Sequence, residues 1–169
     1  MATPSAAEEA ASLHLPDEAA TAAFGRALAR LARPGDLIAL EGDLGAGKTL
    51  IARAFINALP GPDGSPINEE VPSPTFTLVQ VYERLPAPVW HFDLYRIEQP
   101  EEIFELGIEE ALAEGISLVE WPQRMGEAFH VAGRLDVQIS FASQETARDI
   151  RFLGGPAWQE RIGVLLSDG

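Results

Sequence analysis

The chain has 169 residues, 46% of them hydrophobic, and a formal net charge of −14, because 26 acidic residues outnumber 12 lysines and arginines. This length and apolar content suit one folded domain with a full core and argue against a disordered chain. The charge argues against stand-alone binding to nucleic acid or to an anionic membrane, and the lack of cysteine excludes disulfides and thiolate metal sites.

The N-terminal segment has neither the basic start nor the apolar centre of a secretory signal, and it is too acidic for a transit peptide. No stretch approaches the run of about 18 apolar residues that a membrane-spanning helix needs. We therefore expect a cytoplasmic protein without membrane contact.

Apolar spacing and turn residues predict a flexible tail over 1–12 and a single domain over 13–169, with no internal repeat. In chain order the predicted elements are helix 16–32, strand 36–42, helix 48–59, a proline-rich loop 60–74, strands 75–84 and 89–96, helix 100–115 with a break near Gly107, strand 116–121, strands 134–142 and 146–154, and helix 156–167. Strand 75–84 is expected to pair with 89–96, and 134–142 with 146–154, as two hairpins. The order of elements indicates an α/β fold.

Residues 42–49 read Gly-Asp-Leu-Gly-Ala-Gly-Lys-Thr and match the phosphate-binding pattern G-x-x-x-x-G-K-[ST] between a predicted strand and a predicted helix. The glycines let the backbone present N–H groups to phosphate oxygens, and the helix adds its positive end. Lys48 is the only lysine in the chain, and its compact charge suits the slot between two phosphates better than a planar guanidinium. The Thr49 hydroxyl can bind Mg²⁺.

This motif predicts a P-loop that binds a nucleoside triphosphate and Mg²⁺. The expected nucleotide contacts are Gly42, Asp43, Leu44, Gly45, Ala46, Gly47, Lys48, Thr49 and Leu50. Guanine-specific P-loop proteins usually carry an Asn-Lys-x-Asp motif, which needs a second lysine that this chain lacks. ATP is therefore favoured by elimination.

A P-loop enzyme also needs a carboxylate at the end of a neighbouring strand to complete the magnesium shell. Glu120 ends the apolar strand 116–121, where a charge is costly without a cation, and Asp93 lies in strand 89–96. The alternative for each is a solvated strand end, and alternation could turn Asp93 toward solvent. Both remain candidates.

Three further features each allow two interpretations. The segment 72–78, Pro-Ser-Pro-Thr-Phe-Thr-Leu, is either a turn or a switch-like loop in which Thr75 senses the γ-phosphate. Trp121 is either a packing aromatic or a lid near the nucleotide. His91 shares a strand face with Asp93 and is interpreted as a core residue rather than a base. The other histidines are scattered, so no zinc site is expected.

The segments GDLGAGKT, SPTFTLV, HFDLYR and LVEWPQR follow one another in the order and rough spacing of the bacterial TsaE (YjeE) family. The LPDEAAT stretch before the first helix also resembles the start of that family, so the resemblance covers about residues 15–153. The P-loop segment is generic, whereas its combination with the other three is specific. Two departures are Leu50, where a second threonine is common, and a loop at 60–71 that looks longer than usual.

The resemblance implies a single P-loop NTPase-like α/β domain with a mixed central sheet flanked by helices. It implies a Mg²⁺-dependent ATPase, slow without partners, that is needed to form N6-threonylcarbamoyladenosine in tRNA. Its partners would be TsaB and TsaD, so that it meets tRNA only indirectly, through the complex. ATP hydrolysis would reset that complex between turnovers.

Carried over by position, the resemblance implies roles for residues around the nucleotide. Lys48 and Thr49 would meet the phosphates and Mg²⁺, Glu120 would complete the metal shell, and Asp93 would assist the metal or position the water. Thr75 would lie in the switch-like loop, Trp121 would flank the nucleotide, and Glu18 and the Ala147–Arg148 region would lie near the base or ribose.

Two other functions remain open at this point. One is a small-molecule kinase on a P-loop scaffold, although such enzymes usually carry an arginine-bearing lid. The sequence shows no arginine cluster of that kind, since Arg148 and Arg151 lie close together but on an alternating strand. The other is a nucleotide-gated binding module whose turnover is incidental.

Overall fold

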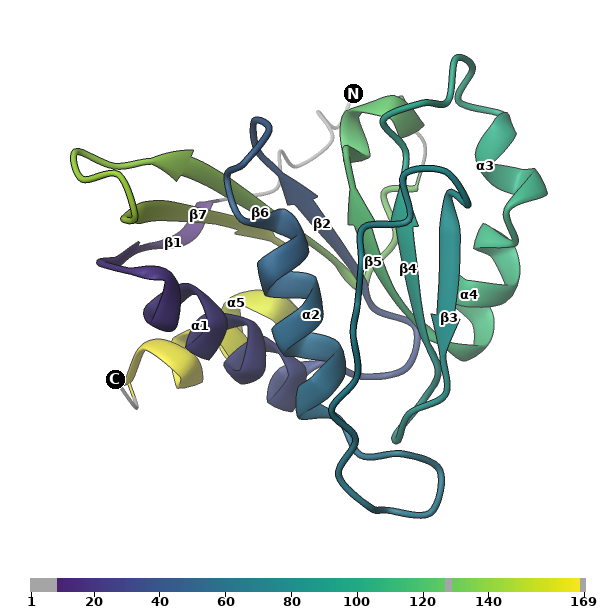
Figure 1. The fold of residues 1–169 in the computed structure, drawn as a ribbon, viewed down its shortest axis with the longest axis horizontal. Coiled ribbons are helices and arrows are strands. Elements are labelled where there is room, and N and C mark those ends of the chain that lie inside the picture. Colours follow the sequence, from purple (N-terminus) through teal and green to yellow (C-terminus); the bar gives the residue numbers. More distant parts are fainter. Residues whose placement is uncertain (1–8, 127–128, 168–169) are drawn as a thin grey trace.

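A mixed sheet forms the centre of the computed structural model, which describes residues 9–126 and 129–167 (Figure 1). Within these residues the sheet has seven strands in the order β1-β7-β6-β2-β5-β4-β3. The strands are β1 (Glu9–Leu15), β2 (Leu37–Glu41), β3 (Val79–Tyr82), β4 (Val89–Asp93), β5 (Ile116–Glu120), β6 (Arg134–Phe141) and β7 (Arg148–Gly154). Strand β2 runs parallel to β5 and β6, β4 runs parallel to β5, and the remaining pairs are antiparallel. The predicted α/β class, the mixed sheet and both hairpins are confirmed.

Helices cover both faces of this sheet (Figure 1). They are α1 (Glu18–Leu31), α2 (Lys48–Ala58), α3 (Glu102–Glu105), α4 (Ile108–Glu114) and α5 (Pro156–Ser167), and a 3₁₀ turn spans Pro122–Met125. The first, second and fifth helices pack on one face, and α3 and α4 pack on the other. The break predicted near Gly107 is confirmed, since this glycine separates α3 from α4. No helix in the described part of the chain is long and apolar enough to cross a membrane.

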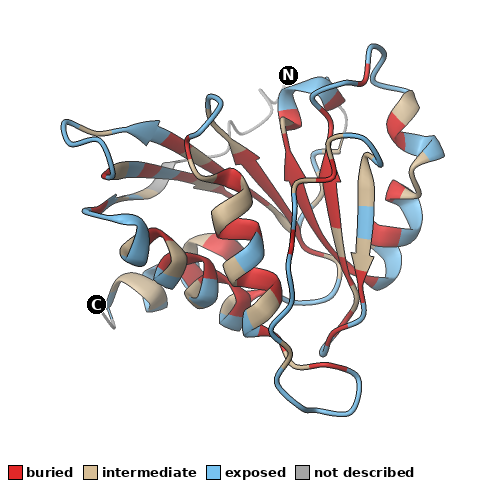
Figure 2. Ribbon diagram, in the orientation of Figure 1, coloured by how far each residue is buried: buried red, intermediate tan, exposed pale blue. Residues whose placement is uncertain are grey.

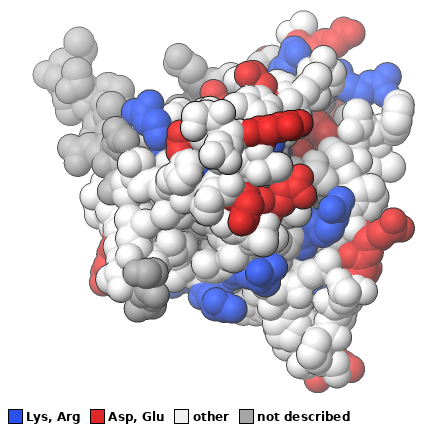
Figure 3. Space-filling model, turned by 60° about the vertical axis from the view of Figure 1, so that its left-hand side comes forward, with Lys and Arg blue, Asp and Glu red and all other residues white. Residues whose placement is uncertain are grey.

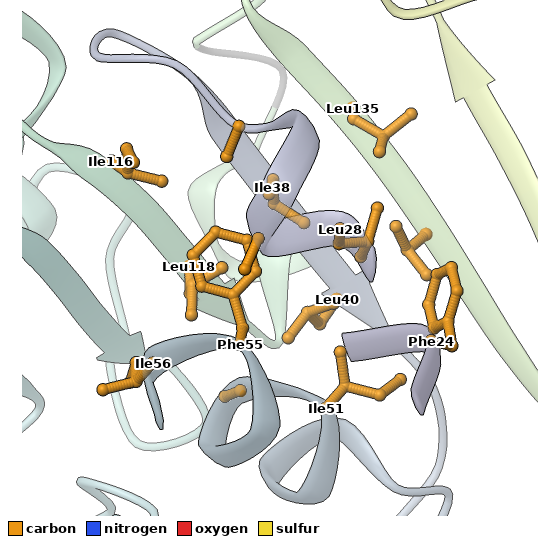
Figure 4. Packing of buried hydrophobic residues seen from close by; sticks show 14 of the residues in the cluster. Phe24, Leu28, Ile38, Leu40, Ile51, Phe55, Ile56, Ile116, Leu118 and Leu135 are labelled. Atoms are coloured by element: carbon orange, nitrogen blue, oxygen red, sulfur yellow. The ribbon is translucent and has the colours of Figure 1, made fainter. Parts of the chain in front are cut away.

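The central strands are largely buried (Figure 2), and β2 carries apolar side chains toward both faces of the sheet. Ile38 and Leu40 of β2 face the core under α1 and α2, while Leu37 and Ala39 face the core under α3 and α4. Figure 4 shows the first of these cores, in which Phe55 of α2 packs with the residues from β2 and β5. A continuous apolar run is typical of a strand that is buried on both faces. This burial fixes the strand ends that carry the functional residues.

The start of α1 is set by Asp17, which lies just before the first helical residue in an extended conformation. Its side chain accepts a hydrogen bond from the backbone N–H of Ala20 at 2.8 Å, which satisfies one of the free donors at the helix start. The helix therefore begins at Glu18 rather than at residue 16, and this places Glu18 at its first turn.

Two predictions about chain segments need correction. Residues 9–12, predicted to belong to a flexible tail, form part of β1 and pair with β7, while residues 1–8 lie outside the described residues. The predicted strand 75–84 is also too long, because β3 starts only at Val79. The preceding residues form a turn in which the N–H of Leu78 donates to the carbonyl of Pro74 at 2.7 Å. Leu78 has a positive φ of 70°, which a strand residue does not adopt.

Gly25 allows α1 and α2 to approach each other closely. A Cβ atom added at Gly25 would lie 2.7 Å from the carbonyl oxygen of Ile51 and 3.0 Å from the Cβ of Ala54. Since backbone cannot move aside cheaply, Gly25→Ala is expected to lower the free energy of unfolding by about 1–3 kcal/mol. Urea denaturation followed by circular dichroism measures this change.

The matched control is Gly163→Ala in α5, where an added Cβ would meet no atom within 4 Å. Alanine has the higher helix propensity, so this variant is expected to be unchanged or up to about 1 kcal/mol more stable than the parent. Equal stability of the two variants would contradict the close helix contact at Gly25.

Candidate functional site

A cavity of about 470 Å³ opens where β2, β5 and β4 end, at the edge of the sheet where α/β proteins commonly bind ligands. Its wall combines the P-loop, the first turn of α1, the 72–78 segment and the ends of β4 and β5. The lining residues are Glu18, Thr21, Leu44, Gly45, Ala46, Gly47, Lys48, Thr49, Leu50, Ser73, Thr75, Asp93, Tyr95, Glu120, Trp121, Thr146 and Arg148.

The P-loop reverses the chain between β2 and α2. Gly45 and Gly47 have φ values of +79° and +113°, and such left-handed conformations favour glycine because it has no Cβ. Gly47 is also the residue before the first turn of α2, so the amino end of that helix faces the cavity. A helix start carries free N–H groups and a positive partial charge, which suits a phosphate.

Lys48 begins α2 and is almost completely buried. Its ammonium Nζ donates to the carbonyl oxygens of Gly42 at 2.5 Å and Asp43 at 2.9 Å. The same nitrogen lies 4.3 Å from the ring centroid of Trp121, in cation–π distance. Gly42 and Asp43, which the sequence analysis expects to contact the nucleotide, hold the lysine through their carbonyls and are not among the residues that line the cavity.

Burial lowers the pKa of Lys48 below its ordinary value, because water is withdrawn from the charged form. The carboxylates of Glu120, Asp93 and Asp43 act in the opposite direction and offset part of this shift. A positive group in a weakly hydrated wall can attract an anion strongly, since the lower local dielectric screens their charges less.

Glu120 ends β5 with its side chain at the cavity, and it is 2% exposed. The hydroxyl of Thr49 donates to the two carboxylate oxygens of Glu120 at 3.0 and 3.3 Å. On the other side, Nε2 of His91 lies 2.5 Å from Oε2 of Glu120. The alternative of a solvated strand end is therefore wrong for Glu120.

Asp93 ends β4 opposite Glu120 in the strand register, and it is 3% exposed. The hydroxyls of Ser73 and Thr75 donate to its Oδ2 at 2.6 and 3.2 Å, and the N–H of Tyr95 donates to its Oδ1 at 3.0 Å. The alternative that Asp93 faces solvent is wrong. These bonds tie the 72–78 segment directly to the end of β4.

The oxygen donors gathered here fit Mg²⁺ by their chemistry. The hydroxyl of Thr49 and the carboxylates of Glu120 and Asp93 all line the cavity, and hard cations prefer such oxygen ligands. Among the described residues, no group of three or more His, Cys, Asp or Glu side chains is placed to hold a metal by itself. The protein can thus supply part of a shell, as is usual for Mg²⁺ that also binds phosphates and water.

Trp121 follows Glu120 directly and has a positive φ of 60°, which is rare for a bulky residue. This conformation turns the chain out of β5 and brings the indole ring to the cavity, beside Lys48 and 4.9 Å from the ring centroid of Tyr95. Such strained residues gather at functional sites. Trp121 thus lines the cavity, as the lid interpretation requires, and also packs against an aromatic neighbour.

Arg148 lies at the start of β7 and reaches across to the P-loop. Its guanidinium donates to the carbonyl oxygens of Ala46 at 2.8 Å and Gly45 at 3.1 Å, and it stacks over the ring of Phe141 at 4.6 Å. Both Arg148 and Glu18 line the cavity. Arg148 therefore has a structural contact with the P-loop that the sequence did not predict.

Most residues that the sequence singled out are gathered by the fold around one cavity, Gly42 and Asp43 excepted. The sequence interpretation missed four lining residues, which are Thr21, Ser73, Tyr95 and Thr146. Ser73 and Tyr95 lie inside the SPTFTLV and HFDLYR segments, so the resemblance of these segments to the family could have pointed to both residues. Thr21 of α1 likewise ends the quoted LPDEAAT segment, whereas Thr146, in the turn before β7, lies in none of the quoted segments.

The chain is similar to known proteins of one family. A family model described as "Threonylcarbamoyl adenosine biosynthesis protein TsaE" matches residues 15–150. Two relatives carry the name "tRNA threonylcarbamoyladenosine biosynthesis protein TsaE". The Bacillus subtilis protein is 38% identical over 78% of this chain and 78% of its own length. The Haemophilus influenzae protein is 31% identical over 86% of this chain and 90% of its own length. The match to the Rickettsia felis protein of the same name is 42% identical and spans 66% of this chain and 62% of the relative's length.

The fold is also similar to that of a solved protein. The crystal structure of Bacillus subtilis YdiB superposes with a TM-score of 0.69 and 28% sequence identity, over 94% of this chain and 95% of YdiB. The family match covers the P-loop, the 72–78 segment and the ends of β4 and β5. The chain belongs to the TsaE family, which confirms the resemblance inferred from its four motifs.

Proposed function

We propose that this protein is a Mg²⁺-dependent ATPase that acts with TsaB and TsaD to form N6-threonylcarbamoyladenosine in tRNA. The observation that carries the proposal is the hydrogen bond between Thr49 and Glu120, at 3.0 Å, next to Lys48 in the P-loop cavity. A threonine from the P-loop and a carboxylate from a neighbouring strand are the pair that P-loop enzymes use around the metal. The names of the TsaE relatives supply the pathway.

The residues of the cavity would have different roles in the transfer of the γ-phosphoryl group to water. Lys48 and the free N–H groups at the start of α2 would hold the phosphate oxygens and stabilise the charge that develops on them. Mg²⁺, when bound by Thr49 and Glu120, would neutralise further phosphate charge. Asp93 would accept a hydrogen bond from a water or complete the metal shell. The water oxygen forms a bond to the γ-phosphorus as the bond to the bridging oxygen breaks in line with it.

The 72–78 segment is well placed to respond to the nucleotide. Ser73 and Thr75 bond to Asp93, which lines the cavity, while Phe76 between them and β3 is 84% exposed. A change in the hydrogen bonds that Asp93 accepts from Ser73 and Thr75 would therefore shift the segment that carries the exposed side chain of Phe76. This supports the switch-like interpretation of Thr75.

The surface charge supports an indirect role toward tRNA. On the face shown in Figure 3, the described Lys and Arg side chains are scattered among acidic and uncharged ones rather than gathered in one large basic area. Together with a net charge of −14, this disfavours independent binding to an RNA backbone. TsaB and TsaD are therefore the expected contacts to tRNA.

The test measures the fate of the γ-phosphate of ATP with the chain alone and with added TsaB and TsaD. Slow release of inorganic phosphate is expected from the chain alone, and a rise of at least about 10-fold is expected with the partners, since partners can accelerate P-loop enzymes by up to about 10⁵-fold. Transfer of phosphate to a metabolite would instead support a kinase. Binding of ATP without turnover in either condition would support a nucleotide-gated binding module.

A further inference from the structure

His91 contacts the proposed magnesium carboxylate from inside the core. It lies in β4 and has no exposed surface. Its Nε2 lies 2.5 Å from Oε2 of Glu120, while its Nδ1 has no hydrogen-bond partner among the described residues. The contact with Glu120 is thus the polar interaction that compensates the burial of this ring.

The register of the sheet makes this contact possible. His91 lies opposite Leu118, and Asp93 lies opposite Glu120, so these four side chains share one sheet face because strand side chains alternate. Glu120 is the diagonal neighbour of His91, within reach of a long side chain. If the position needed only volume, an aliphatic residue would fill it without the cost of burying an imidazole.

The direction of the bond follows from the chemistry of its partners. An ionised carboxylate only accepts hydrogen bonds, so Nε2 of His91 carries the hydrogen that it donates to Oε2. The other oxygen, Oε1, accepts from the Thr49 hydroxyl at 3.0 Å. The Thr49 hydroxyl lies farther from Oε2, at 3.3 Å, so the carboxylate is contacted by two different donors from two sides and is held with Oε1 toward the P-loop.

We propose that His91 is a positioning residue that holds the carboxylate of Glu120 in the orientation needed to bind Mg²⁺ with Thr49. The inference rests on the proposed function, since it concerns the same metal. Partners that orient a metal ligand typically contribute about 10- to 100-fold to metal affinity or activity. Without the imidazole, the side chain of Glu120 would regain rotamer freedom, and Mg²⁺ binding would have to restrict it again.

The experiment measures how much Mg²⁺ strengthens nucleotide binding in the parent, in His91→Gln and in His91→Asn. Isothermal titration calorimetry with adenylyl imidodiphosphate is run once with Mg²⁺ and once with EDTA. The readout is the dissociation constant in EDTA divided by the dissociation constant in Mg²⁺. A glutamine amide can place an N–H donor near the Nε2 position, whereas an asparagine amide reaches only the Nδ1 position. The two variants are thus matched in polarity and differ in donor placement.

The expected ratio falls about 10- to 100-fold in His91→Asn and stays within about threefold of the parent in His91→Gln, while binding in EDTA is unchanged in both. Circular dichroism confirms that each variant is folded. If His91→Asn does not fold, the ratio in folded His91→Gln decides, and its loss despite the retained donor would overturn the inference.

Two other results would overturn it. An unchanged ratio in His91→Asn would show that Glu120 needs no such partner. Equal weakening with Mg²⁺ and with EDTA would show that His91 acts on the fold of the cavity alone. A parent protein whose nucleotide binding does not depend on Mg²⁺ would contradict the proposed function itself, and the inference with it. That failure is recognised because it appears without any substitution.

Discussion

Lys48→Ala is expected to lower the rate of ATP hydrolysis by about 100- to 1,000-fold, the loss that follows removal of one preorganised transition-state donor. Its ammonium is held in the cavity wall by the carbonyls of Gly42 and Asp43, within reach of the phosphates that the P-loop would hold. Alanine removes the charge without adding bulk. Single-turnover hydrolysis of radiolabelled ATP, with TsaB and TsaD present, measures the effect.

The controls separate charge from shape and from fold. Lys48→Arg keeps the charge but presents a planar guanidinium, so most of the loss is expected to persist. Arg26→Ala removes an exposed arginine of α1 that does not line the cavity, and its hydrolysis is expected to match that of the parent. A folded Lys48→Ala variant that turns over at the parental rate would refute the phosphate role of this residue.

The second large effect is expected at Glu120. Glu120→Gln keeps the size of the side chain but removes the charge that faces Thr49, and hydrolysis at limiting Mg²⁺ is expected to fall about 100-fold or more. The Mg²⁺ concentration for half-maximal rate is expected to rise by at least about tenfold, because a carboxylate ligand is replaced by a neutral amide. Titration of the rate with Mg²⁺ at saturating ATP measures both changes.

Asp93→Asn is the matched comparison, since both carboxylates end neighbouring parallel strands and both are nearly buried. If Asp93 orients water, this variant loses turnover but keeps the parental Mg²⁺ midpoint. A parental midpoint in Glu120→Gln together with a raised midpoint in Asp93→Asn would assign the metal to Asp93 and contradict the role given to Glu120.

The parts of this site that follow from local sequence could be predicted. The glycines of 42–49 and the lone lysine are a contiguous pattern, and their geometry is set by backbone rules that act over a few residues. The apolar patterns of 116–121 and 89–96 predicted strands that carry Glu120 and Asp93, but they left open whether either carboxylate is buried. Position at the same end of parallel strands then brings these residues together.

The parts that depend on distant segments could not be predicted. Strand β1 contains alanine and glutamate, which have a low propensity for strands, so its sequence does not predict one. It forms by pairing with the edge of β7. The bonds from Arg148 to the P-loop join residues about a hundred positions apart, which no local pattern encodes. His91 is a core residue, as predicted, but its bond to Glu120 could not be predicted because Glu120 lies on another strand.

The account depends on a triphosphate site in the P-loop cavity, and equilibrium dialysis with radiolabelled ATP and Mg²⁺ tests it most directly. The structure predicts saturable binding of one ATP per chain by the parent, weakened at least about tenfold in Lys48→Ala through loss of one charged contact. Folded parent protein that retains no ATP over the buffer, with TsaB and TsaD absent or present, would contradict it.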